Sequence, residues 1–148
     1  MKKNRFLRQN AVTFIEIMIV VVIMAAIAAL AGPALFSQFG GAQVNNAKTE
    51  MGSIISALEL YNLDNKKFPS TEQGLDALIK KPSLGIIPEN WNGPYLKGNA
   101  APDDPWGNNY LYENSGQIFT LKTFGADGLE GGDGNNKDLS CSPQSCNY

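Results

Sequence analysis

Residues 12–36 read VTFIEIMIVVVIMAAIAALAGPALF, and this stretch decides the fold. A transmembrane helix requires about 20 mostly apolar residues. The stretch supplies 25 residues, interrupted by one acid, Glu16, and one proline, Pro33. No further charge follows Glu16 until Lys48. The sequence therefore predicts a membrane-spanning helix over residues 12–36.

Glu16 is the informative residue of this segment. A carboxylate at bilayer depth costs about 2.5 to 3.5 kcal/mol on insertion scales, and less near the interface, so such a charge usually has a partner. If the chain were cut between Ala11 and Val12, the new α-amino group of one copy would neutralise Glu16 of a neighbouring copy when the helices bundle. The buried acid would then favour assembly of several copies.

The charges are divided by position along the chain. All four charges before Glu16 are basic, whereas the rest of the chain carries eight basic and fourteen acidic residues. A basic head before an apolar run predicts a cytoplasmic N-terminus by the positive-inside rule. The acidic remainder argues against nucleic-acid binding.

The composition also argues against catalysis. The sequence contains no histidine, which is the commonest general base and a frequent metal ligand. Asp103 and Asp104 are adjacent carboxylates, but in a proline-flanked turn such side chains usually face water and cap backbone amides. We therefore expect no enzyme activity.

Two cysteines, Cys141 and Cys146, lie five residues apart near the end of the sequence. They are too isolated for a four-ligand zinc site. We expect a disulfide that closes a short loop in an oxidising compartment. The alternative is a pair of free thiols on a flexible tail.

The motif NAVTFIE at residues 10–16 resembles the processing site of type IV prepilins and pseudopilins. The resemblance implies that prepilin peptidase cuts between Ala11 and Val12 and that Val12 is then N-methylated. It also implies assembly roles for Glu16, the fifth mature residue, and for Pro33, where the family commonly has a proline that loosens the helix. Ala11 stands where the family prefers glycine, and Val12 stands where it usually has phenylalanine.

Two other interpretations of the N-terminal segment remain open. The tripeptide Ala29-Leu30-Ala31 fits an ordinary signal-peptidase site, which would release a soluble calcium-binding module starting at Gly32. Alternatively, the segment is a plain single-pass anchor with Glu16 near the lipid headgroups. Neither explains why an acid follows Val-Thr-Phe-Ile at this spacing.

A second helical pattern follows the diglycine Gly40-Gly41, which we expect to loosen the helix between its two halves. Apolar residues recur at the spacing of one helical face, namely at Ala47, Met51, Ile54, Ile55, Leu58 and Tyr61. The pattern predicts a helix to about Leu63, amphipathic in this half and packed on a globular core.

The remaining sequence predicts a small antiparallel sheet. Ser70 and Gln73 have capping-box spacing and predict the start of a short helix. Alternating apolar residues over 110–112 and 118–124, on either side of Asn114-Ser115-Gly116, predict two strands. We expect a sheet of two or three strands packed on the long helix, which is an α+β fold.

The glycine-rich segment 125–138 holds the only cation chemistry that the sequence suggests. It places carboxylates and amides among glycines, and Ca²⁺ takes six to eight oxygens from carboxylates and backbone carbonyls. The spacing is not that of an EF-hand, so a solvated acidic turn is the alternative.

Two further stretches resemble the G-type major pseudopilins of type II secretion systems. They are residues 61–75, which include FPSTEQGL at 68–75, and the turn Asp104-Pro105-Trp106-Gly107. The resemblance also covers the Gly-Ala-Asp-Gly loop and implies that it binds a structural calcium ion. The implied ligands are the side chains of Asp127, Asp133, Asp138 and Asn135 or Asn136, together with the carbonyls of Phe124 and Leu129.

On this resemblance the chain is a structural major pseudopilin with a pilin-like fold. Residues 1–11 form the leader peptide, residues 12–36 the transmembrane and assembly helix, and residues 37–148 a periplasmic domain. The implied partners are further copies of the chain, prepilin peptidase, minor pseudopilins, the inner-membrane secretion platform and the inner membrane itself. A type IV pilus subunit at the cell surface remains the main alternative. Such pilins share this N-terminus but usually have a larger domain closed by a disulfide loop, and Cys141 and Cys146 keep this alternative open.

Overall fold

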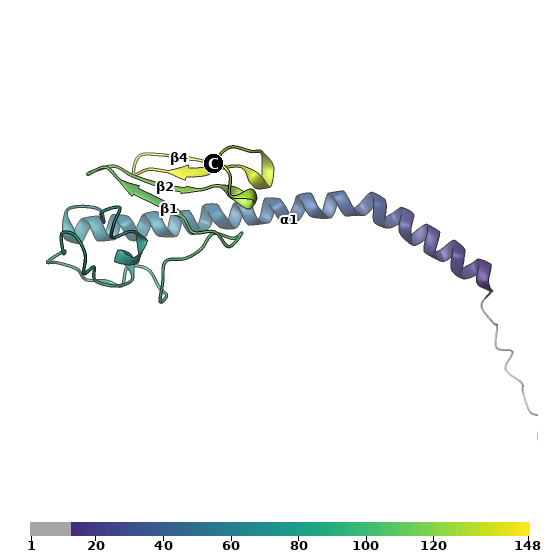
Figure 1. The fold of residues 1–148 in the computed structure, drawn as a ribbon, viewed down its shortest axis with the longest axis horizontal. Helices are drawn as coiled ribbons and strands as arrows, with labels where there is room; N and C mark the ends of the chain where they lie inside the picture. The colour runs from purple at the N-terminus through teal and green to yellow at the C-terminus, as the bar shows by residue number, and fades with distance from the viewer. Residues whose placement is uncertain (1–12) are drawn as a thin grey trace, which may run out of the picture. The chain divides into compact units, whose positions relative to one another are not determined.

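The computed structural model describes residues 13–148, and within them the side chains outside residues 32–39. The longest element is α1, Phe14–Asn65, a single helix of 52 residues (Figure 1). Its backbone stays helical through Gly40 and Gly41. The chain divides into two compact units, Met1–Gln38 and Phe39–Tyr148.

The described part of the first unit is an apolar helix without a core of its own. Its window Phe14–Ala31 is the one helical segment of residues 13–148 that is long and apolar enough to cross a membrane, and none of it is buried. Its large apolar side chains are between 46% and 83% exposed. Such a surface is stable only when lipid or other helices cover it.

The second unit is built on the amphipathic half of α1. The predicted stripe is confirmed, since Ala47, Met51, Ile54, Leu58 and Tyr61 are all buried. Ile55 is only partly buried against the same core. The helix ends at Asn65, two residues beyond the predicted end.

The sheet has four strands rather than the two or three expected. They are β1 (Leu111–Asn114), β2 (Phe119–Thr123), β3 (Leu139–Cys141) and β4 (Cys146–Asn147). Their spatial order is β1-β2-β3-β4, and every neighbouring pair is antiparallel. The two predicted strands are confirmed, and the segment that carries the cysteines supplies the other two.

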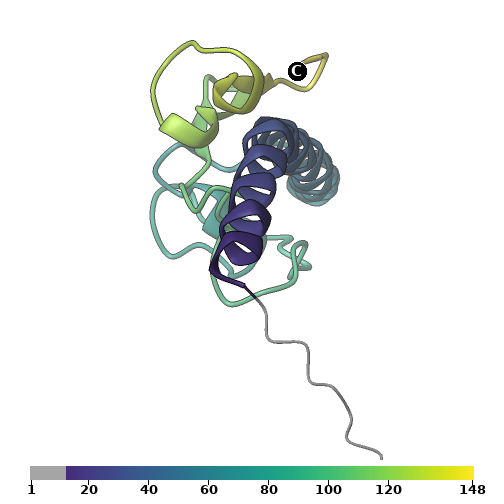
Figure 2. The ribbon, with the colours of Figure 1, turned by 90° about the vertical axis from the view of Figure 1, so that its right-hand side faces the viewer.

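One hydrophobic core joins the sheet to α1. Phe119, Leu121 and Leu139 on β2 and β3 are fully buried in the cluster that includes the α1 stripe. The sheet lies along one side of α1, and the loops that precede β1 lie along another (Figures 1 and 2). The α+β prediction is therefore confirmed.

The capping box at Ser70 and Gln73 forms as predicted, and a short helix follows it. The Gln73 amide donates to Ser70 Oγ over 3.3 Å, and the Ser70 amide donates to Gln73 Oε1 over 3.0 Å. Gly74 then has a φ of 57°, which interrupts helical geometry. The predicted short helix is the 3₁₀ helix η1, Leu75–Leu78, which follows a turn.

Candidate functional site

The N-terminal end of α1 is capped by its own side chains. The Thr13 amide donates to Glu16 Oε2 over 3.4 Å, and the Glu16 amide donates to Thr13 Oγ1 over 3.3 Å. This is the reciprocal pattern of a capping box, which stabilises a helix N-terminus. The Thr-x-x-Glu spacing of residues 13–16 is the sequence signal for this cap, and it was not among the predicted features.

Glu16 therefore acts as a cap within its own chain. Its side chain is exposed and forms no salt bridge with another described residue. Ala11 and Val12 lie outside the described residues. Pro33 lies within α1, but its side chain is not among those described.

The segment 124–138 folds back on itself between β2 and β3. It contains two short 3₁₀ helices, η2 (Gly125–Asp127) and η3 (Gly134–Asn136). Gly125 has a φ of 65°, and a Cβ atom placed there would lie 2.7 Å from the carbonyl carbon of Asn136. Only glycine fits this contact, so Gly125 allows the two ends of the loop to touch.

The predicted ligand side chains do not all converge. Asp127 is exposed and its Oδ1 accepts the Leu129 amide over 3.1 Å. Asp133 is also exposed. Across residues 13–148 no three acidic, histidine or cysteine side chains form a group that could hold a metal ion. A cation here would depend mainly on backbone carbonyls, such as those of Phe124 and Leu129.

Asp138 is the residue that best fits a cation. Its Oδ2 accepts the Gly131 amide over 3.1 Å, whereas its Oδ1 is buried and has no hydrogen-bond partner among the described residues. A buried carboxylate oxygen without a partner is unfavourable. A calcium ion bound to Oδ1 would satisfy it, so the donor chemistry of Asp138 fits the expected ion.

Of the two asparagines, Asn135 is engaged elsewhere. Its Oδ1 accepts the indole Nε1–H of Trp106 over 3.0 Å. Asn136 is exposed, and it is the better candidate to donate a side-chain oxygen. The sequence alone did not separate these two residues, because the contact joins positions 29 residues apart.

Trp106 belongs to a turn that is organised by the buried carboxylate of Asp104. Asp104 Oδ1 accepts hydrogen bonds from the Trp106 amide over 3.1 Å and the Asn108 amide over 2.8 Å, while Asp104 Oδ2 accepts one from the Thr123 hydroxyl. Asp104 therefore caps amides as expected, but it does not face water, since it is only 5% exposed. The turn supports the loop through Trp106.

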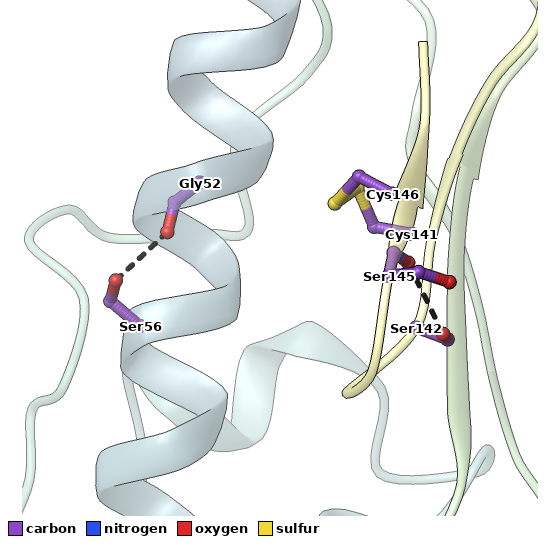
Figure 3. Close-up of a disulfide and its surroundings, with 6 residues drawn as sticks. All are labelled: Gly52, Ser56, Cys141, Ser142, Ser145 and Cys146. Atoms are coloured by element: carbon purple, nitrogen blue, oxygen red, sulfur yellow. Dashed lines mark hydrogen bonds between the residues drawn. A yellow bond between two sulfur atoms is a disulfide. The ribbon is translucent and has the colours of Figure 1, made fainter.

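Cys141 and Cys146 are joined by a disulfide at the end of the sheet (Figure 3). They face each other across β3 and β4, and the amide and hydroxyl of Ser142 both donate to the Ser145 carbonyl, over 2.8 and 3.2 Å. The segment is thus a closed hairpin and not a flexible tail.

The hairpin also reaches the loop and α1 through Tyr148. Lys137 Nζ donates to the Tyr148 carbonyl over 2.8 Å. Lys48 Nζ lies 5.2 Å from the centre of the Tyr148 ring, a cation–π contact. The disulfide therefore fixes a segment that touches both α1 and the candidate cation loop.

Removing the disulfide is expected to lower the free energy of unfolding by about 2 kcal/mol. This value is at the low end for a disulfide because the closed loop is short. The variant is Cys141→Ala with Cys146→Ala, compared with wild type by chemical denaturation in detergent. Reductant should lower wild-type stability by a similar amount and leave the double variant unchanged. Equal stability of oxidised and reduced wild type would contradict the prediction.

An exposed apolar helix that continues into a small α+β domain defines a membrane-anchored protein of the pilin-like class. The family described as type II secretion system (T2SS), protein G, matches residues 34–142. The chain belongs to this family, and its role is that of a pseudopilin in type II protein secretion. The family is one of structural secretion-system components.

Individual relatives agree with this assignment. The chain is 47% identical over 135 residues to the type II secretion system core protein G of Pseudomonas aeruginosa, covering 89% of this chain and 94% of the relative. It is 41% identical over 142 residues to the protein of the same name from Vibrio cholerae, covering 94% of each.

A solved structure supports the fold. It is the crystal structure of the major pseudopilin from the type 2 secretion system of enterohaemorrhagic Escherichia coli. The two chains superpose with a TM-score of 0.59 at 31% identity, over 72% of this chain and 91% of the other. The resemblance stated from the sequence is thereby confirmed.

Proposed function

We propose that the chain is the major pseudopilin, the repeating subunit of a periplasmic filament that drives type II secretion. The observation that supports this proposal is the apolar helix Phe14–Ala31, in which no residue is buried and which has a single acid near its start. Such a helix is stable in lipid, and it is also stable when it packs among copies of itself. The protein acts by assembly and not as an enzyme.

The proposed route begins in the inner membrane with the basic head in the cytoplasm. Prepilin peptidase removes residues 1–11, and Val12 becomes the methylated first residue. The free α-amino group of Val12 then pairs with Glu16 of the neighbouring copy, which offsets the penalty of a carboxylate in an apolar bundle. The domain of residues 37–148 lies in the periplasm, where minor pseudopilins and the inner-membrane platform are its further partners.

A structural calcium ion is part of the proposal. Asp138 would hold it through Oδ1, with Asp127, Asp133 and Asn136 as further side-chain candidates and the carbonyls of Phe124 and Leu129 completing the set. The ion would supply positive charge to a loop whose acidic side chains repel one another. The chain's own residues close the loop around it through Gly125.

The N-terminal mass of the protein purified from membranes tests the processing step. We expect a chain that starts at Val12 and carries one methyl group. A chain that starts at Gly32 would identify an exported soluble module and end the proposal. Electron microscopy of intact cells separates the remaining alternative, since abundant surface fibres would indicate a type IV pilus.

A further inference from the structure

Lys122 lies at the candidate cation loop and makes three contacts there. Its Nζ is 3.3 Å from Glu130 Oε1 and 3.9 Å from Asp138 Oδ2. It also lies 4.9 Å from the centre of the Phe124 ring. The ammonium group therefore lies near the first and last residues of the segment 124–138 and near one residue between them.

The position of Lys122 on β2 explains how it reaches these groups. It alternates with the buried Leu121 and Thr123, so its side chain leaves the face that packs on α1. Its register partner on β3 is Ser140, two residues beyond Asp138. The side chain is 24% exposed, so its charge is only partly screened by water.

Lys122 lies near only one of the two carboxylate oxygens of Asp138. It approaches Oδ2, whereas the buried Oδ1 is left without a hydrogen-bond partner in the described chain. The two oxygens of one carboxylate would therefore serve two cations, the resident ammonium group at Oδ2 and a metal ion at Oδ1. Because like charges repel, each weakens the binding of the other.

We propose that Lys122 is a built-in counter-ion that holds the loop closed without metal and lowers its affinity for calcium. This inference rests on the proposed calcium site for its second half only. A charge that stabilises the metal-free loop more than the metal-bound loop reduces the stability that calcium adds. Lys122 thus sets how strongly the fold depends on the ion.

The Glu130 contact alone would not carry this effect. The Glu130 side chain is 83% exposed, and exposed ion pairs contribute little to stability. The Asp138 side chain is 20% exposed, and the Phe124 ring adds a cation–π contact. The effect of Lys122 is therefore expected to depend on Asp138 and Phe124.

The test uses the variant Lys122→Met in the full chain, solubilised in detergent. Methionine is chosen because it keeps an unbranched side chain and removes the charge. In chelator the variant should melt about 4 °C below wild type. Its calcium dissociation constant, from titration with CaCl₂ alone, should fall about fivefold. The two effects have opposite signs, which a general packing defect would not produce.

Two variants serve as controls. Lys122→Arg keeps the charge and should behave like wild type in both measurements. Lys80→Met removes an exposed lysine in another loop and should change neither. An unchanged melting temperature of Lys122→Met in chelator, or weaker calcium binding, would overturn the inference. A wild-type protein that ignores calcium would refute the calcium part of the proposed function, while the chelator measurement still decides whether Lys122 holds the loop.

Discussion

Glu16→Ala is expected to abolish filament assembly while the chain still inserts in the membrane. On the proposed pairing, the substitution would leave the Val12 α-amino group of the neighbouring copy unpaired in an apolar bundle, and breaking a buried ion pair costs about 3 to 5 kcal/mol. A loss of about 3 kcal/mol reduces the association constant at each contact roughly a hundredfold. Because the apolar residues of Phe14–Ala31 remain, the membrane fraction should contain wild-type amounts of the variant.

The measurement compares sheared or pelleted filaments with the membrane fraction from the same cells. Glu16 also caps α1 together with Thr13, so two further variants separate the cap from the charge. Glu16→Gln keeps a capping side chain but loses the charge, and it should fail to assemble. Thr13→Ala weakens the cap but keeps the charge, and it should assemble. The reverse outcome would show that the cap, rather than the pairing between chains, explains Glu16.

Chelation is expected to lower the melting temperature of the full chain in detergent by about 11 to 22 °C. A ligand present at a hundred times its dissociation constant adds about 2.7 kcal/mol to the stability of a folded protein. For a domain of about 100 residues each kcal/mol corresponds to about 4 to 8 °C. The physical reason is that Asp138 Oδ1 is buried without a hydrogen-bond partner in the described chain.

Asp138→Asn should remove most of the calcium response, whereas Asp103→Asn, an exposed acid in another turn, should retain it. Mg²⁺ should replace calcium poorly, since it demands a smaller and more regular octahedral site. Identical melting curves in calcium and in chelator would remove the ion from the proposal. A response that survives in Asp138→Asn would mean that other ligands hold it.

Local signals predicted most of the fold. The apolar stripe of α1 and the alternation along β2 are repeated within a few residues, so the sequence shows them directly. The capping box of Ser70 and Gln73 was also predictable from its spacing. The helix type was not, because the positive φ of Gly74 precedes a 3₁₀ helix. A glycine predicts that a positive φ is possible, and not that it occurs.

Contacts between segments far apart in the chain could not be predicted from the sequence. The strands β3 and β4 have three and two residues, too short for a pattern, and they form because the sheet and the disulfide hold them. The loop ligands depend on which side chains are already engaged. Asn135 is taken by Trp106, and Lys122 occupies one side of Asp138.

The hairpin of β3 and β4 has a consequence for a protein made in many copies. Unpaired strand edges invite sideways annealing and aggregation. At this edge the sheet ends in β4, which has two residues and is joined to β3 by the disulfide. A strand from another molecule would find almost no backbone to pair with there. Aggregation through this sheet edge is therefore disfavoured when many copies are close together. Association between copies is left to the apolar helix Phe14–Ala31.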